Sequence, residues 1–342
     1  GENAVVVHRT MAGGGFGATL DPLIAEQAAS LAVKLRRPVS LVWSRGEDVL
    51  HDRYRPPARA RMAARLAANG AILGWSAKIA APETGKQIAR RVLPQGVVEA
   101  VTIGARGDRY AVAGAVPPYR IPALAVDHHP AEIGVPTGHL RGGAHGYTCF
   151  FTESFIDELA HVAGNEPLSY RIGMLGGDAR LARCLSTVAA LGGWDGGVPG
   201  SGQGIACHAF RGSYIAVLAE AHVGDDRRIV VDRIVAAVDC GRSINPDLVR
   251  QQIEGGLIFG MAQALGVSTG FIRGLADMRG FGGLALPRLV DTPDIIVDIA
   301  RSDEAPGGVG DLAVPPVAPA IANALQSATG YRIRALPLRP GK

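Results

Sequence analysis

A glycine-rich loop near the start of the chain is the first segment whose residues could do chemistry. Residues 12–18 read Ala-Gly-Gly-Gly-Phe-Gly-Ala, between a strand-like run of valines and a predicted helix. Backbone that carries no side chains allows a ligand to approach the chain closely. A tight structural turn would use the same glycines, but a single aromatic residue inside the loop, Phe16, is unusual for plain turn chemistry.

The spacing within this loop also matches a dinucleotide-binding fingerprint. Gly13, Gly15 and Ala18 fit the GxGxxG/A pattern that places a pyrophosphate at the start of a helix. This interpretation requires an acidic residue at the end of the next strand, to hold the ribose. Residues 36–45 contain no Asp or Glu. A Rossmann-type dehydrogenase therefore stays an alternative that lacks its ribose-binding acid.

Cysteine, histidine and charge patterns narrow the chemistry further. The four cysteines form no CxxC pair and the nine histidines form no HExxH motif, so no zinc, iron–sulfur or histidine metal site is predicted. The net charge is +4, but the basic residues occur as scattered pairs with no interleaved aromatics. A solvated basic surface is expected, and no nucleic-acid partner.

Length and composition predict a folded chain with a large core. The 342 residues are 47% hydrophobic, with a mean hydropathy of +0.16. This length suits one large domain or two to three smaller ones. No apolar run reaches the roughly 18 residues that a membrane-spanning helix needs, so no membrane span is expected.

The local patterns predict strands and helices that do not alternate strictly, which is typical of an α+β fold. An Asn-Gly dipeptide between two strand-like runs predicts a β-hairpin over 58–80. Residues 148–193 are predicted to be helical, and the glycine-rich stretch 192–204 is the best candidate linker. The other predicted elements are helices at 22–35, 246–265 and 320–328, and strands at 4–7, 39–43, 123–128, 214–223, 229–238 and 294–299.

Three further segments carry motifs. In chain order they are Leu140-Arg141-Gly142-Gly143 with 153–160, then 237–241 with Asn245-Pro246 and 252–256, and finally 306–311 with 315–324. Together with the glycine loop, their order and spacing resemble the xanthine dehydrogenase family of molybdenum hydroxylases, over about residues 4–338. The most similar type is the β-subunit of isoquinoline 1-oxidoreductase. Each motif alone is weak, but four in the same order are a specific signal.

The resemblance implies both the architecture and the domain division. The fold would be α+β, with mixed sheets and packed helices, as in the molybdopterin-binding domain of molybdenum hydroxylases. Residues 1–195, including the hairpin 58–80 and the helical segment 148–193, would form a first molybdopterin-binding region. Residues 204–342 would form a second.

The resemblance also implies a cofactor and the residues that line it. The cofactor would be molybdenum bound to molybdopterin cytosine dinucleotide, with no protein side chain assigned as a metal ligand. The residues placed beside this cofactor are Gly14, Gly15, Phe16, Gly17, Arg141 and Gly310, with Arg141 on the side of the pocket opposite the glycine loop. Without the motif around it, Arg141 would be interpreted as an ordinary surface ion pair.

Asp311 matches the position of the family's catalytic base. That base is a glutamate in a Gly-x-Gly-Glu motif, and it removes a proton during attack on an electron-poor carbon. Aspartate keeps the carboxylate but withdraws it by one methylene, roughly 1.5 Å. General-base contact needs about 2.6–3.2 Å, directly or through one water, so direct proton transfer would be compromised unless the loop moves inward.

Four other polar residues in the motifs are expected to have structural roles. Glu153 and Asp157 are predicted to be helix-end or packing partners, and Asp239 and Asn245 are predicted to organise a turn and a helix cap. The adjacent glycines of 252–256 are unfavourable in a helix, so close packing against a protein or cofactor neighbour is expected there.

Two main hypotheses follow for function. In the first, the chain is part of the large subunit of a molybdenum hydroxylase that hydroxylates an N-heterocycle or oxidises an aldehyde. Its partners would be a small [2Fe-2S] subunit that accepts electrons, the N-terminal portion of the large subunit or a companion chain, and a small-molecule substrate. In the second, the chain is a catalytically incompetent remnant that keeps the fold without the cofactor. The bacterial periplasm is the expected compartment, with the cytoplasm as the alternative.

Overall fold

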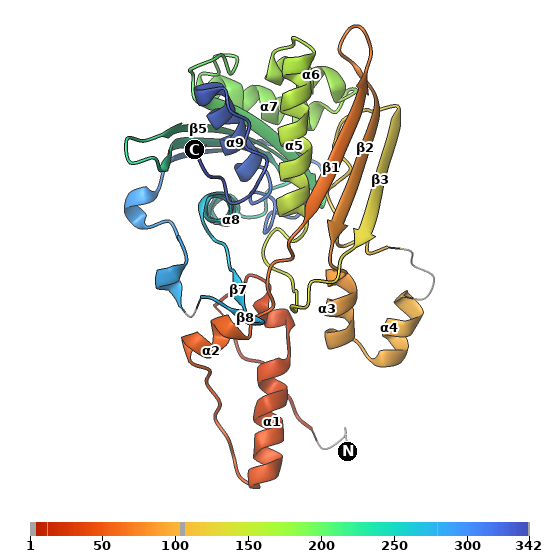
Figure 1. The fold of residues 1–342 in the computed structure, drawn as a ribbon, viewed down its shortest axis with the longest axis vertical. Helices are drawn as coiled ribbons and strands as arrows, with labels where there is room; N and C mark the ends of the chain where they lie inside the picture. Colours follow the sequence, from red (N-terminus) through yellow and green to blue (C-terminus); the bar gives the residue numbers. More distant parts are fainter. Residues whose placement is uncertain (1–4, 12, 103–106, 279, 341–342) are drawn as a thin grey trace.

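The computed structural model describes residues 5–11, 13–102, 107–278 and 280–340, and it confirms the predicted α+β class. Two main sheets are mixed, because each joins antiparallel neighbours to one parallel strand. Helices pack around them, and α1 (Leu23–Leu35) projects from the body of the molecule (Figure 1).

The first sheet contains the predicted hairpin. Strands β1 (Arg59–Leu66) and β2 (Ile72–Ala81) pair antiparallel, and β3 (Ala123–Pro130) pairs parallel with β2. Gly70 adopts a φ of +82° in the connecting turn, a conformation that glycine tolerates without strain. Alternate residues of β2 are buried, which fixes the face that packs on the helices.

The second sheet lies between two layers of helices. It contains, in spatial order, β4 (Gln203–Phe210), β5 (Ser213–Val223), β6 (Ile229–Asp239) and β9 (Asp294–Ile299). Odd-numbered residues of β5 pack with α8 (Pro246–Leu265) and α9 (Val317–Thr329). Even-numbered residues pack with α5 (His145–Val162) and α7 (Ala179–Gly192). Burial on both faces explains why these strands read as nearly continuous apolar runs.

Local capping residues begin the principal helices where the sequence predicts. Glu166, Asp178 and Asn245 each accept hydrogen bonds from backbone N–H groups in the first turn of α6 (Pro167–Met174), α7 and α8. Asn245 is therefore a helix cap, as expected. Asp239 also organises its turn, because its Oδ1 accepts the N–H of Gly241. Helix α9 begins at Val317, three residues before the predicted start.

Two strand predictions are wrong. Residues 5–7 and 39–43 do not form strands. Their valines lie at the surface: Val5, Val6, Val7 and Val42 are all more than two-thirds exposed. A strand requires a neighbouring strand to satisfy its backbone, and none in the described part of the chain lies beside these segments. Ala4, the first residue of the predicted strand 4–7, lies outside the described residues. The Rossmann alternative needs both strands and is not supported.

Several elements carry no sequence signal that predicts them. Strand β4 begins inside the predicted linker, at Gln203. The others are short: α2 (Arg45–Leu50), α3 (Thr84–Val92), α4 (Gln95–Thr102), β7 (Phe271–Ile272), β8 (Leu275–Ala276), and the 3-10 turns η2 (Ala18–Leu20), η3 (Phe281–Gly283) and η4 (Leu289–Asp291). Most lie in glycine-rich or exposed stretches, where local patterns are weak.

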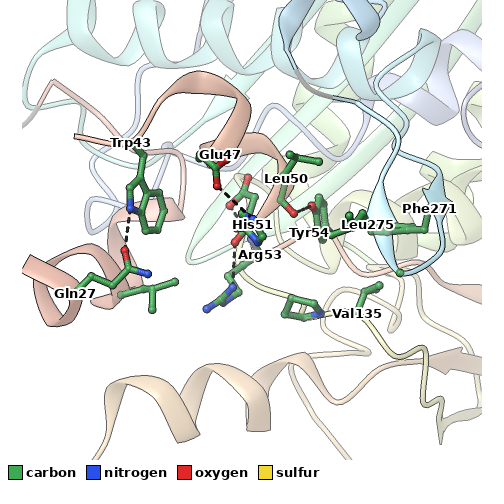
Figure 2. Close-up of a pocket in the computed structure, with 14 residues that line it drawn as sticks. Gln27, Trp43, Glu47, Leu50, His51, Arg53, Tyr54, Val135, Phe271 and Leu275 are labelled. Carbon is green, nitrogen blue, oxygen red and sulfur yellow. Dashed lines mark hydrogen bonds and ion pairs between the residues drawn. The ribbon is translucent and has the colours of Figure 1, made fainter. Parts of the chain in front are cut away.

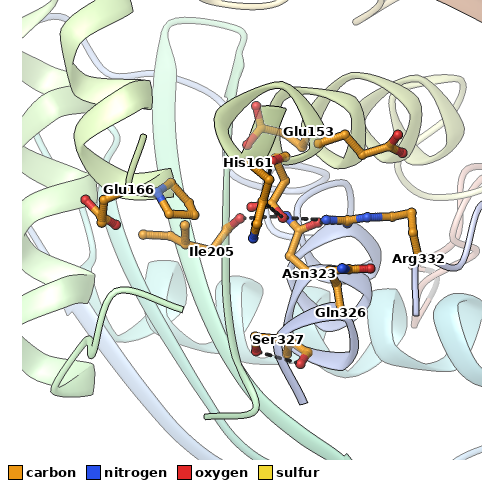
Figure 3. Close-up of polar contacts among 12 residues, drawn as sticks. Glu153, His161, Glu166, Ile205, Asn323, Gln326, Ser327 and Arg332 are labelled. Atoms are coloured by element: carbon orange, nitrogen blue, oxygen red, sulfur yellow. Dashed lines mark hydrogen bonds and ion pairs between the residues drawn. The ribbon is translucent and has the colours of Figure 1, made fainter. Parts of the chain in front are cut away.

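Helix α9 is bonded directly to the backbone of the edge strand β4. Asn323 donates from Nδ2 to the Ile205 carbonyl over 3.0 Å, and the Ser327 hydroxyl donates to the Gln203 carbonyl over 2.8 Å (Figure 3). Between these two contacts lies Gly204. A side chain there would collide with backbone, because its Cβ would lie 2.1 Å from the Ala324 nitrogen.

This contact predicts a large effect from the smallest possible substitution. We expect Gly204→Ala to lower the free energy of unfolding by about 1–3 kcal/mol, because neither backbone can move without breaking hydrogen bonds. Urea denaturation measures the difference. The matched control is Gly173→Ala in α6, where a Cβ would meet no atom within 4 Å. This control should be neutral or stabilising; equal effects of the two substitutions would contradict the prediction.

Candidate functional site

Arg141 connects segments that are far apart in the sequence. Its backbone N–H donates to the Phe16 carbonyl over 2.7 Å, and its Nε donates to the Gly310 carbonyl over 2.7 Å. Its Nη2 donates to the carbonyl and the side-chain oxygen of Gln252, over 3.0 and 2.9 Å. Only 8% of the residue is exposed. Residues from all four motif segments therefore meet at Arg141: the glycine loop, 140–143, 252–256 and 306–311. The stretch 237–241 is not among these contacts.

The Asp311 carboxylate lies against the next residue of the same turn. The N–H of Gly142 donates to Asp311 Oδ1 over 3.3 Å. Asp311 is half-buried and makes no ion pair with a residue of the described ranges. Gly142 has a φ of +90°, and a Cβ there would lie 2.9 Å from the Val314 side chain, so glycine is needed at this position. The glycine loop and Asp311 thus contact consecutive residues, Arg141 and Gly142.

Phe16 adopts a conformation that is uncommon for a residue with a side chain. Its φ is +50°. Its ring stacks on Phe259 of α8, with centroids 5.5 Å apart, and Arg141 lies 5.8 and 5.9 Å from the two ring centroids. Phe16 nevertheless stays 56% exposed. Phe259 was not predicted, and it carries no motif of its own.

Two glycines of the loop are required by packing within the protein. A Cβ on Gly15 would lie 2.3 Å from the Thr19 side chain. Gly17 has a φ of +117°, and a Cβ there would lie 2.1 Å from the His139 carbonyl oxygen. The small size of these two residues is therefore explained without a ligand.

Three other glycines face open space and fit a bound cofactor. A Cβ on Gly13 or Gly310 would meet no atom within 4 Å, and one on Gly14 would meet only the Phe16 ring, at 4.0 Å. This open backbone lies next to the exposed Phe16 and the half-buried Asp311. Backbone amides of this kind are suited to a large polar cofactor. The residues present therefore fit a molybdopterin group held on this face.

The glycines of α8 pack against protein. A Cβ on Gly256 would lie 2.8 Å from the Ala313 side chain and 3.6 Å from Arg141 Nη2, and one on Gly255 would lie 3.7 Å from Arg141 Nη1. The helix lacks side chains here because Arg141 and the loop after Asp311 pass close to it. This answers the question that the sequence left open about the neighbour of 252–256.

Several titratable groups near Asp311 were not predicted. Tyr110 and His139 share a hydrogen bond of 2.6 Å between the hydroxyl and Nδ1. Burial raises the pKa of Tyr110 to about 12, and burial lowers the pKa of His139 while the charge of Asp311 opposes that shift. His139 lies only two positions before Arg141, but a lone histidine in a loop gives no signal by itself.

His145 and His208 form a buried pair beside this cluster. His145 Nδ1 and His208 Nε2 are 2.9 Å apart, and the His145 ring packs edge-on against Phe210. Burial lowers the pKa of His145 to about 4 and that of His208 to about 3. Both imidazoles are therefore neutral at physiological pH.

This pair predicts acid-sensitive stability. In the unfolded chain these histidines take up protons below a pKa of about 6.5, but in the folded chain only near pH 4 or lower. The unfolded state therefore binds more protons as the pH falls through this window, and each histidine removes up to about 1.4 kcal/mol of stability per pH unit. We expect His208→Asn to flatten the loss between pH 7 and 5, measured by urea denaturation. The exposed strand residue His129, changed to Asn, is the control; an unchanged slope in His208→Asn would refute the assignment.

A cavity lies away from these residues. It has a volume of about 440 Å³ and lies between α1, α2, residues 135–136 and the β7–β8 hairpin. Figure 2 shows Trp43 bonded to Gln27 on one side of it, and Tyr54 beside Phe271 on the other. None of the predicted site residues, all of which lie in the described ranges, lines this cavity. A second cavity of about 50 Å³ adjoins the site and is lined by Gly17 and His139 among others.

Side chains typical of metal sites do not gather elsewhere in the described residues. No group of three or more His, Cys, Asp or Glu side chains in these ranges could hold a metal ion. The four cysteines are buried free thiols. No helix in the described ranges has the length and apolar character to cross a membrane.

Comparison with known proteins identifies the family. The profile of the molybdopterin cofactor-binding domain matches residues 1–173, and a second profile of the same description matches residues 201–293. The chain belongs to the molybdopterin-binding large subunits of the molybdenum hydroxylase family. This agrees with the resemblance seen in the motifs, whereas the division into regions 1–195 and 204–342 stays a prediction.

Two similar proteins are longer than this chain. Isoquinoline 1-oxidoreductase subunit beta of Brevundimonas diminuta is 28% identical and matches 98% of this chain, which spans 43% of that protein. The membrane-bound aldehyde dehydrogenase [pyrroloquinoline-quinone] of Gluconacetobacter polyoxogenes is 29% identical over 99% of this chain and 46% of that protein. The chain thus spans less than half of either relative.

A solved structure supports the fold. Quinoline 2-oxidoreductase from Pseudomonas putida 86 superposes with a TM-score of 0.77, covering 96% of this chain and 67% of that chain, at 13% identity. This likeness establishes the mixed α+β architecture of the family. The roles of Gly14, Gly15, Phe16, Gly17, Arg141, Gly310 and Asp311 toward a cofactor stay predictions.

Proposed function

We propose that this chain supplies part of the molybdopterin site of a molybdenum hydroxylase that hydroxylates an N-heterocycle or oxidises an aldehyde. The single observation that carries the proposal is the meeting of the Phe16 loop and the Asp311 loop at Arg141 and Gly142, in a chain of this family. The names of the two relatives supply the substrate classes.

The cofactor and the protein would divide the work. When bound, the molybdenum cofactor, proposed in its cytosine dinucleotide form, supplies the two-electron oxidation. The open backbone at Gly13, Gly14 and Gly310 would hold it beside Phe16. Asp311 would accept the proton that is released when oxygen is transferred to the substrate carbon. Electrons would leave to a small [2Fe-2S] subunit.

The exposed apolar side chains of the first 44 residues support the presence of a further polypeptide. Helix α1 has no buried residue, and the extended segments 5–11 and 38–44 expose apolar side chains without a neighbouring strand. Apolar surface on this scale marks an interaction site. We propose that further large-subunit sequence, of the kind present in the longer relatives, covers helix α1 and the segments 5–11 and 38–44. This sequence could belong to the same polypeptide or to a companion chain.

A second candidate function is a remnant that keeps the fold without turnover. The observation that favours it is aspartate at position 311, where the family motif has glutamate, because the shorter side chain draws the carboxylate back toward Gly142. The buried core and capped helices would persist in such a remnant, so fold stability alone does not separate the two candidates.

Metal and nucleotide analysis separates them. The chain should be co-expressed with the neighbouring subunits and purified as the complex, then analysed for molybdenum and for the pterin nucleotide. Stoichiometric molybdenum with a cytosine nucleotide is the expected result. A folded complex that is empty under all conditions would overturn the proposal and favour the remnant, and stoichiometric bound NAD or FAD would overturn both.

A further inference from the structure

Arg55 is a half-buried cation without an acidic partner among the described residues. It makes no ion pair with a described residue, and its Nε is buried without a hydrogen-bond partner. Its two terminal nitrogens each donate to backbone: Nη1 to the Gly143 carbonyl over 3.0 Å and Nη2 to the Arg141 carbonyl over 2.8 Å. Burial lowers the pKa of Arg55 to about 10, against the opposing influence of Tyr110, Tyr147 and Asp311. Such a charge is costly to bury, so its position calls for an explanation.

The two carbonyls that Arg55 binds flank the residue that contacts Asp311. Arg55 holds the carbonyls of Arg141 and Gly143. In the same turn, the N–H of Arg141 donates to the Phe16 carbonyl and the N–H of Gly142 donates to Asp311. Gly142 and Gly143 both have positive φ and little intrinsic preference, so the turn does not hold this orientation by itself.

A planar guanidinium suits this task better than an ammonium. Its forked N–H groups can bind two acceptors in a fixed relative geometry, whereas a lysine is a single mobile point charge. Packing supports the fork as well, because a Cβ on Gly146 would lie 3.2 Å from Arg55 Nη1. The first turn of α5 is therefore free of a side chain where Arg55 passes.

We propose that Arg55 is a positioning residue that locks the turn 141–143, so that the Gly142 amide aims the Asp311 carboxylate and the Arg141 amide anchors the Phe16 loop. This role rests on the proposed function of Asp311, but the orientation of the turn can be tested without turnover.

Hydrogen–deuterium exchange measures that orientation in the purified complex. We expect Arg55→Lys to increase exchange in peptides covering 139–147 by about tenfold or more, because a single ammonium cannot hold both carbonyls in the fixed geometry of the guanidinium. Exchange in β4–β6 should not change. The matched control is Arg59→Lys, an exposed arginine of β1. Wild-type exchange at 139–147 in Arg55→Lys, or a uniform increase along the chain, would overturn the proposal.

A second variant and a second readout complete the test. If Arg55→Lys does not fold, Arg55→Gln, which keeps one donor group, takes its place; failure of both to fold would make Arg55 a general stability determinant and overturn the positioning role. In a complex that turns over, Arg55→Lys should lower kcat by about tenfold or more, with KM and molybdenum content unchanged. If the wild-type complex shows no turnover, the proposed function fails, while local exchange still decides the role of Arg55.

Discussion

Replacing Asp311 with asparagine should abolish turnover and leave the molybdenum content unchanged. Asparagine has nearly the same shape and can still accept the N–H of Gly142 through its side-chain oxygen. It cannot accept a proton as a carboxylate does. Loss of a general base typically lowers the rate by about 10²–10⁴-fold, so kcat in the assembled, loaded enzyme should fall by that factor.

Two further variants make this result specific. Asp303→Asn changes an exposed aspartate earlier in the same loop region and should have no effect on kcat. Asp311→Glu restores the length found in the family motif, so it should keep or raise kcat. Full turnover in Asp311→Asn would refute the base assignment. Molybdenum lost from Asp311→Asn would instead show that the carboxylate helps to hold the cofactor.

The second large effect should come from the buried cluster of charges between α5 and α6. Arg171 is fully buried, and its Nε lies 3.0 Å from Glu153 Oε2 and its Nη1 3.4 Å from Asp157 Oδ1. Glu153 also accepts the hydroxyl of Tyr119 over 2.6 Å and the N–H of Cys207 over 3.0 Å. Burial works to lower the pKa of Arg171, but Glu153 together with Tyr119, Asp157 and Cys207 outweighs burial, so the pKa lies above its ordinary value. The expected packing roles of Glu153 and Asp157 are thus what the structure shows.

Removing this cation should be severely destabilising. Arg171→Met leaves two nearly buried carboxylates without their shared partner, and breaking a buried ion pair costs about 3–5 kcal/mol. Arg332, labelled in Figure 3, also pairs with Asp157 over 2.6 Å. In the described chain Arg332 makes no ion pair with Glu153, so it cannot replace Arg171 there. Urea denaturation should therefore show a lower midpoint with a similar slope.

A surface pair provides the control for that measurement. Arg334 pairs with Glu158 of α5, but the arginine side chain is 67% exposed. Arg334→Met should change the free energy of unfolding by no more than about 1 kcal/mol, since exposed pairs are screened by water and salt. Similar losses in Arg171→Met and Arg334→Met would mean that burial does not set the strength of these pairs.

The sequence by itself determined much of the framework. The Asn-Gly turn of the hairpin and the helix cap at Asn245 depend on interactions between residues a few positions apart. Such local rules can be read from a pattern because they do not depend on the rest of the fold. The α+β class followed from such local patterns, and the family was indicated by the resemblance of four motifs in the same order.

Only the tertiary structure decided which side chains surround Asp311. Arg55, His139 and Phe259 lie in unremarkable local sequence, and the contacts of Arg141 with Arg55 and Gly310 join residues 86 and 169 positions apart. The failed strand at 39–43 has the same origin, because strand formation depends on a neighbour that local sequence does not specify. Long-range contacts of this kind are fixed by how whole elements pack together, so no short stretch of residues encodes them.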